Sequence, residues 1–244
     1  VITESSNNKI IQNIVKGNGK YGIQILNDAT KSANNTIKDN TVNDNSDIAI
    51  FNHGIFTKII NNTVKYNEQD GIKIASDGAR SSISSNNLVD NEGKSIIILA
   101  KNIAIESNNI DADSSEIAIS ILNANFASIE NNTVEGGNLG IKVQNSTSAF
   151  IYNNTIKSNS GYGIQLLINS ESARVKYNQL TDNEDNAIVI SSSNLTEVYN
   201  NTIKENAGYG FAATNSNLID FKGNTIEDNA VSYTHLTLPT SFLV

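Results

Sequence analysis

Residues 151–159 read Ile-Tyr-Asn-Asn-Thr-Ile-Lys-Ser-Asn, and close variants of this stretch recur along the sequence as far as residue 229. The constant feature is an Asn with an apolar residue three positions before it and another two positions after it. Ten such Asn residues occur at intervals of 22 to 27 residues: Asn13, Asn40, Asn62, Asn86, Asn108, Asn132, Asn154, Asn178, Asn201 and Asn224. Repeats of this length, which bury their apolar faces only against neighbouring repeats, are typical of solenoid proteins.

Each repeat contains three short segments in which apolar and polar residues alternate. One precedes the Asn, as in 149–152, and one follows it, as in 155–157. The third lies about ten residues later and has the form Gly-Ile-x-apolar at 22–25, 71–74, 140–143 and 163–166. Alternation at period two with β-branched residues indicates strands, and no stretch keeps a helical period. The sequence therefore predicts an all-β parallel β-helix over residues 1–230, with about ten coils of three short strands each.

The recurring Asn has two physical explanations. A tight bend between strands needs a left-handed or bridge backbone conformation, which Asn tolerates well. Its amide also carries a donor and an acceptor, so equivalent Asn residues one coil apart can form a hydrogen-bonded ladder. A second column, five residues after the first, predicts another ladder and consists of Asn18, Asn45, Asn67, Asn91, Asn159, Asn183, Asn206 and Asn229. Asp113 and Gly137 replace Asn in two adjacent repeats of this column.

The motif Ile-x-Asn-Asn-Thr-Ile, seen at 151–156 and with Val substitutions at 129–134 and 198–203, resembles the repeats of a known family. That family is the right-handed parallel β-helix proteins of the pectin-lyase-like superfamily, and NosD-like repeats are the most similar subgroup. The resemblance covers residues 9–230 and implies a right-handed, single-stranded parallel β-helix. It further implies a microbial protein that is secreted, periplasmic or at the cell surface, with a polysaccharide or surface glycan as partner. The superfamily includes enzymes and adhesins, so the fold alone does not decide the activity.

The composition excludes several classes of site and partner. The chain has no Cys and no Met, so it can form neither disulfides nor a Cys-based metal site. Its net charge of −8 argues against nucleic acid and against an anionic membrane surface as partners. No apolar run approaches the roughly 20 residues that a membrane-spanning helix needs.

An acidic concentration in the fifth and sixth repeats is a candidate metal site. Asp111 and Glu135 each follow a ladder Asn by three residues, so they are expected to lie about one strand spacing apart, and Asp113 lies near them. Like charges on neighbouring strands repel, and a calcium ion with oxygen ligands would relieve that repulsion. Lys142 follows this turn and is a candidate catalytic base. The alternative is a solvated acidic patch without a metal.

In the enzymes of this superfamily, the resemblance implies, the substrate lies along the outer face of the third strand, where acidic residues hold calcium and Arg or Lys removes a proton. The sequence predicts these outward positions at Gln24, Ala49, Lys73, Ile97, Ala118, Lys142, Gln165, Val189 and Ala212. None is a carboxylate, so the usual lyase groove is not expected here. We interpret His53 as a solvated turn residue. The tyrosines are expected to lie in separated coils and to form no continuous platform: Tyr21, Tyr152, Tyr162, Tyr199 and Tyr209.

The repeat pattern stops after residue 230. Residues 231–244 contain the only Pro and one of the two His residues, and they resemble a translated sequencing adapter. We therefore expect a non-native tail rather than a capping segment, and both natural ends are expected to be missing.

For residues 1–230 we expect a non-catalytic surface module that binds or displays glycans. The alternative is a carbohydrate-active enzyme, a polysaccharide lyase or an epimerase, whose catalytic residues lie partly outside this fragment. An ice-binding or purely structural rod is a third possibility, but charged residues beside the Thr column disfavour a flat ice-binding face.

Overall fold

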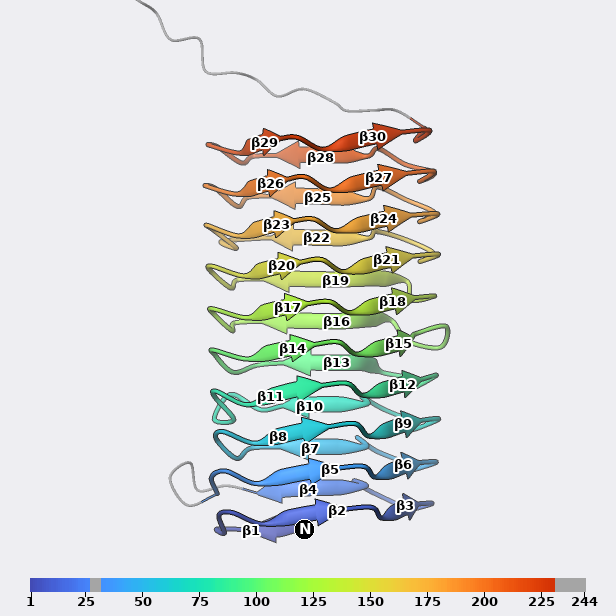
Figure 1. Cartoon of the computed structure of the whole chain (residues 1–244), viewed down its shortest axis with the longest axis vertical. Coiled ribbons are helices and arrows are strands. Elements are labelled where there is room, and N and C mark those ends of the chain that lie inside the picture. Colours follow the sequence, from blue (N-terminus) through green and yellow to red (C-terminus); the bar gives the residue numbers. More distant parts are fainter. Residues whose placement is uncertain (27–31, 231–244) are drawn as a thin grey trace, which may run out of the picture.

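The computed structural model describes residues 1–26 and 32–230 and shows a rod of stacked coils (Figure 1). Its 30 strands form three parallel sheets of ten strands, and each strand pairs with its equivalents one coil away. We number the coils by their ladder Asn, so that coil one contains Asn13 and coil ten contains Asn224. The predicted all-β parallel β-helix is thereby confirmed. The predicted non-native tail, 231–244, lies outside the described residues.

Sheets B and C flank the ladder Asn on its two sides. Sheet B, which precedes the Asn, consists of β2 (Lys9–Ile11), β5 (Thr36–Lys38), β8 (Lys58–Ile60), β11 (Ser82–Ser84), β14 (Ala104–Glu106), β17 (Ser128–Glu130), β20 (Phe150–Tyr152), β23 (Arg174–Lys176), β26 (Glu197–Tyr199) and β29 (Asp220–Lys222). Sheet C, which follows it, consists of β3 (Ile14–Lys16), β6 (Thr41–Asn43), β9 (Thr63–Lys65), β12 (Asn87–Val89), β15 (Asn109–Asp111), β18 (Thr133–Glu135), β21 (Thr155–Lys157), β24 (Gln179–Thr181), β27 (Thr202–Lys204) and β30 (Thr225–Glu227).

Sheet A contains the third strand of each coil. Its strands are β1 (Ile2–Thr3), β4 (Ile23–Leu26), β7 (Ile50–Asn52), β10 (Ile72–Ile74), β13 (Lys94–Ile98), β16 (Ile117–Leu122), β19 (Leu139–Gln144), β22 (Ile164–Leu167), β25 (Ile188–Ser191) and β28 (Phe211–Thr214).

The predicted outward column of sheet A is wrong in two coils. Gln24 pairs with Phe51, so Phe51 occupies the outward position predicted for Ala49. Ile97 pairs with Ser120, so Ser120 occupies the outward position predicted for Ala118. Both alanines are fully buried. In neighbouring coils the equivalent position is occupied by Gly. Space there is limited by the backbone of the next coil, since a Cβ added to Gly163 would lie 2.7 Å from the carbonyl oxygen of Ala187.

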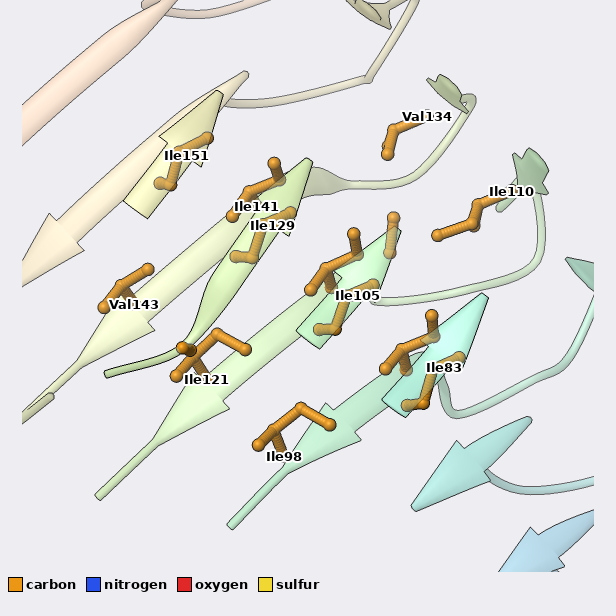
Figure 2. Close-up of a cluster of buried hydrophobic side chains, with 14 of the residues drawn as sticks. Ile83, Ile98, Ile105, Ile110, Ile121, Ile129, Val134, Ile141, Val143 and Ile151 are labelled. Carbon is orange, nitrogen blue, oxygen red and sulfur yellow. The ribbon is translucent and has the colours of Figure 1, made fainter. Parts of the chain in front are cut away.

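The core is a continuous stack of β-branched and Leu side chains inside the three sheets. Figure 2 shows Ile83, Ile105, Ile129 and Ile151 stacked from sheet B, with Ile98, Ile121 and Val143 from sheet A and Ile110 and Val134 from sheet C turned toward them. All nine are at most 1% exposed. Because strand residues alternate between faces, the apolar residues that flank each ladder Asn become the core.

The first Asn ladder is continuous and buried in its central part. The Oδ1 of Asn154 accepts hydrogen bonds from the backbone N–H and the Nδ2 of Asn132 at 2.9 and 3.0 Å. Asn154 in turn donates from the same two groups to Oδ1 of Asn178 at 2.9 and 3.0 Å. The same pattern runs from Asn13 to Asn224. The predicted ladder is confirmed.

The left-handed conformation, however, belongs to another residue. Positive φ angles occur at the residue immediately before each ladder Asn, such as Asn153 (φ 53°) before Asn154 and Tyr177 (φ 59°) before Asn178. The ladder Asn residues themselves have no positive φ. Hydrogen bonding along the stack therefore explains the invariant Asn, and the bend is made by its neighbour.

The second ladder is interrupted in coils five and six. Asn91 and Asn159 lie on either side of the gap, and the buried Oδ1 of Asn159 has no hydrogen-bond partner. Ser115 closes part of the gap by donating from its hydroxyl to the carbonyl oxygen of Asn91 at 2.6 Å. The sheet A strands are longest here, with five residues in β13 and six in β16 and β19. Longer strand pairing in sheet A thus accompanies the interruption of the second ladder.

Candidate functional site

The acidic turn brings together the residues that the sequence singled out. Asp111 and Glu135 are register partners on β15 and β18, as predicted. Partial burial raises the pKa of Asp111 above its usual 3.8, and the charge of Asp113 raises it further. A hydrogen bond from the backbone N–H of Asp113 to the Asp111 carboxylate acts in the opposite direction, while Asp90 and Glu135 add smaller upward contributions.

Two of the three carboxylates in the acidic turn contact other parts of the protein. The Glu135 carboxylate lies 2.8 Å from Nζ of Lys157 on the next strand of sheet C. Asp113 packs its Oδ1 against Gly136, where an added Cβ would lie only 1.9 Å away. Within residues 1–26 and 32–230, no three His, Cys, Asp or Glu side chains are grouped as a metal site. A calcium site at Asp111, Asp113 and Glu135 stays a prediction.

Lys142 lies on the outward face of β19, as predicted. Its register partners are Ser120 and Gln165. In the described parts of the chain it forms no ion pair with the acidic turn, whose cation is Lys157. A catalytic role for Lys142 also stays a prediction, and the structure gives it no acidic partner.

A second cluster, which the sequence did not predict, lies on the outer face of sheet A in coils one to three. The ring of Phe51 lies 5.3 Å from Tyr21 and 4.4 Å from His53, measured between centroids. Nζ of Lys73, the register partner of Phe51 on β10, lies 5.5 Å from the Phe51 ring centroid. We call Tyr21, Phe51, His53 and Lys73 the sheet A cluster. It combines three rings and a cation on one face.

Both basic side chains of the sheet A cluster, His53 and Lys73, lie close to carboxylates. Nδ1 of His53 lies 3.0 Å from Oδ1 of Asp77, and the two side chains are 25% and 31% exposed. Nζ of Lys73 lies 3.8 Å from Asp70. His53 is partly solvated, as interpreted, and its side chain is in addition paired with Asp77. A carboxylate that holds one ring nitrogen fixes the imidazole and leaves the other nitrogen for a ligand or a proton.

Two features hid the sheet A cluster from sequence reasoning. The register shift in coil two placed Ala49 where Phe51 belongs. Asp77 lies 24 residues from His53, in the turn that follows β10, and no motif links the two. The coil period of 22 to 27 residues was the available signal, because a spacing of 24 places two residues about one coil apart.

The remaining tyrosines fall into two groups. Tyr162 is hydrogen-bonded to Asp185, and the charge of Asp185, with partial burial and this bond, raises the pKa of the phenol above 10.0. Tyr152 and Tyr199 lie on β20 and β26 with Lys176 between them in register. Tyr177, which the sequence analysis did not single out, contacts Tyr152 with ring centroids 5.4 Å apart.

Several solved structures share the fold of this rod. The Azotobacter vinelandii mannuronan C-5 epimerase AlgE6 A-module superposes with a TM-score of 0.68 at 16% identity, over 96% of this chain and 76% of that one. A mutant tailspike protein of E. coli bacteriophage HK620, in complex with a pentasaccharide, gives 0.67 at 12% identity, over 96% and 53%. The catalytic unit of a GH87 α-1,3-glucanase from Streptomyces thermodiastaticus gives 0.58 at 13% identity, over 91% and 63%. Likeness at these identities concerns the fold.

Sequence comparison gives the family directly. No curated protein matches the chain in sequence.

The described part of the chain contains no helix with the length and apolarity that a bilayer crossing requires. The sequence model for the family described as "Right handed beta helix region" matches residues 1–88 and 78–226. The chain therefore belongs to the right-handed β-helix family.

Proposed function

We propose that this chain is a carbohydrate-associated module that is secreted, periplasmic or at the cell surface and binds a glycan across the sheet A cluster. The observation that carries the proposal is the contiguous contact of Tyr21, Phe51 and His53, with Lys73 over the middle ring. Aromatic faces pack against the apolar faces of sugar rings, while flanking polar groups hold hydroxyls or carboxylates.

The position of the cluster supports this proposal. The cluster spans three successive coils, so the strand spacing of about 4.8 Å gives it a length of about 10 Å along the rod. A chain ligand that runs parallel to the rod axis could contact each coil in turn. The solved structures with the same fold include an epimerase, a glucanase and a tailspike bound to a pentasaccharide. Those names support a glycan as the class of ligand here.

A second candidate function is carbohydrate-active catalysis, of the lyase or epimerase kind. The observation that favours it is the contact between His53 and Asp77 at 3.0 Å. An imidazole oriented by a carboxylate can accept a proton, and Lys73 could stabilise a developing anion beside it. Non-catalytic binding stays the first choice, because no second acid or base faces His53 across the cluster among the contacts of the described residues.

Binding and catalysis are separated by two variants of the whole chain. Phe51→Ser should weaken binding of alginate oligosaccharides, measured by isothermal titration calorimetry, by roughly three- to tenfold through loss of ring stacking. Val189→Ser, in the same outward column of sheet A but far from the cluster, is the matched control. Equal binding by wild type and Phe51→Ser would refute the proposal. Product formation that His53→Gln abolishes would favour the enzyme instead.

A further inference from the structure

Sheet B carries a second aromatic surface in coils seven, eight and nine. The strands β20, β23 and β26 stack directly on one another there (Figure 1). Their outward residues and one corner residue form what we call the sheet B platform: Phe150, Tyr152, Arg174, Lys176, Tyr177 and Tyr199. The same outward positions of sheet B in coils five and six carry Glu106 and Glu130 in register, and no ring.

Three of the four rings of the sheet B platform contact one another in series, and Lys176 links the fourth to them. Phe150 and Tyr152 have centroids 5.3 Å apart and ring planes only 21° apart. Tyr152 meets Tyr177 edge-on, with centroids 5.4 Å apart. Nζ of Lys176 lies 4.6 Å from the Tyr199 ring centroid, which extends the surface to coil nine. The Tyr199 hydroxyl donates a hydrogen bond to Asp220, and this bond fixes the ring and raises its pKa to about 12.

Tyr177 occupies a position that disfavours a bulky side chain. It precedes a ladder Asn and has φ 59°, where coils three, six, seven and nine have Asn61, Asn131, Asn153 and Asn200. Asn adopts this left-handed conformation readily, whereas a bulky residue there is strained. The Tyr177 side chain is nevertheless 49% exposed, so core packing does not explain it.

The platform also carries two cations, Arg174 and Lys176, beside two carboxylates, Glu197 and Asp220. Glu197 holds Lys176 at 2.6 Å and lies 3.6 Å from Nε of Arg174 through the same oxygen, Oε2. One carboxylate therefore faces two cations, in a chain whose net charge is −8. The Arg174 side chain is 61% exposed, so most of its guanidinium donors face solvent. A planar guanidinium favours carboxylate ligands, which it can bind through two parallel hydrogen bonds.

We propose that the sheet B platform is a binding site for a glycan that carries uronate carboxylates. Tyr177 and Tyr152 stack on sugar faces, and Arg174 pairs with a carboxylate of the same chain. The proposal does not rest on the sheet A cluster, which lies on another sheet and in other coils. A rod with both sites could hold two glycan segments at once.

Tyr177→Asn is the decisive variant, because it restores the residue that four other coils use at this position. We expect an unchanged or higher melting temperature together with roughly three- to tenfold weaker binding of alginate oligosaccharides, measured by titration calorimetry. Phe126→Asn is the matched control. Phe126 is also exposed, at 56%, and has φ 61°, but it lies outside the platform. This control should leave binding unchanged. Arg174→Lys should weaken binding despite keeping the charge, because the two-bond geometry is lost.

The comparison ligands test the assigned chemistry. All titrations are repeated in the Phe51→Ser background, so that binding at the sheet A cluster and at the sheet B platform can fail independently. Neutral dextran should bind more weakly than alginate, and equal binding would overturn the carboxylate assignment. Tighter binding of dextran sulfate would assign the site to sulfated glycans instead. Unchanged alginate binding in Tyr177→Asn and Arg174→Lys would overturn the site itself.

Discussion

Replacing Asn154 by Leu tests the ladder in the middle of the rod. Asn154 is 1% exposed, and its Oδ1 accepts the backbone N–H of Asn132 at 2.9 Å. Its Nδ2 donates to the carbonyl oxygen of Ile129 at 2.8 Å and to Oδ1 of Asn178 at 3.0 Å. A Leu side chain can make none of these hydrogen bonds.

The expected loss of stability follows from the groups left behind. The N–H of Asn132 loses its acceptor and the carbonyl of Ile129 loses a donor, and each buried group without a partner costs about 1–3 kcal/mol. Burial of the Leu side chain offsets about 1.5–3 kcal/mol of this cost. We therefore expect Asn154→Leu to lower the free energy of unfolding by about 1–3 kcal/mol.

Urea unfolding followed by circular dichroism measures this change, provided that the slope of the transition stays constant. Asn13→Leu is the control, because it is the same substitution at the exposed first member of the same ladder. Its effect should stay within about 0.5 kcal/mol, as for other surface substitutions. Equal midpoints for the two variants, or an unchanged midpoint for Asn154→Leu, would refute the ladder as a source of stability.

Three further predictions concern the acidic turn and the tail. Asp111→Asn should raise the melting temperature at pH 7. A raised carboxyl pKa means that the folded protein loses stability as the pH rises above 3.8, so the gain should disappear below that pH, as a thermal series would show. Calcium should leave the melting temperature unchanged, since Lys157 already neutralises Glu135; a rise that is lost in the double variant Asp111→Asn, Glu135→Gln would instead establish the cation site. Truncation after Ala230 should leave the urea midpoint in place, because the described coils are complete up to the hydrogen bond from Ala230 N–H to the backbone oxygen of Asn206; a clear drop would identify residues 231–244 as a cap.

The fold could be predicted from the sequence because each coil repeats the same constraints. The apolar residues three before and two after each ladder Asn face the interior, and the amide forms hydrogen bonds with the neighbouring coils. The register of sheet A was less certain. In coil two, the segment Ile48-Ala49-Ile50 alternates as well as the true segment around Phe51 does. A shift by two residues keeps every side chain on its face, so the hydrophobic pattern cannot detect it.

The candidate sites were harder to predict for the same reason. Both the sheet A cluster and the sheet B platform are made by residues in different coils, and each contact depends on the register between those coils. The spacing of the ladder Asn residues predicted that Asp111 and Glu135 are neighbours, because both follow the ladder at a fixed distance. Asp77 follows β10 through a turn of its own, and no equivalent position in other coils indicates where its side chain lies.

The first Asn ladder gives the rod a chemical direction. Between neighbouring coils, each Oδ1 accepts from the backbone N–H and the Nδ2 of the preceding ladder Asn, and the reverse pairing does not occur among the described residues. The Nδ2 also donates to a backbone carbonyl of the preceding coil, as Asn154 does to Ile129. A cut between two inner coils would therefore leave unpaired backbone N–H groups of the ladder on one surface and unpaired Oδ1 atoms on the other. Two such surfaces can join in a head-to-tail sense and cannot join head to head without leaving like groups opposed. Any coil added to the rod, by recombination or by design, would thus have to enter in the same orientation, with the backbone N–H of its ladder Asn facing the next coil.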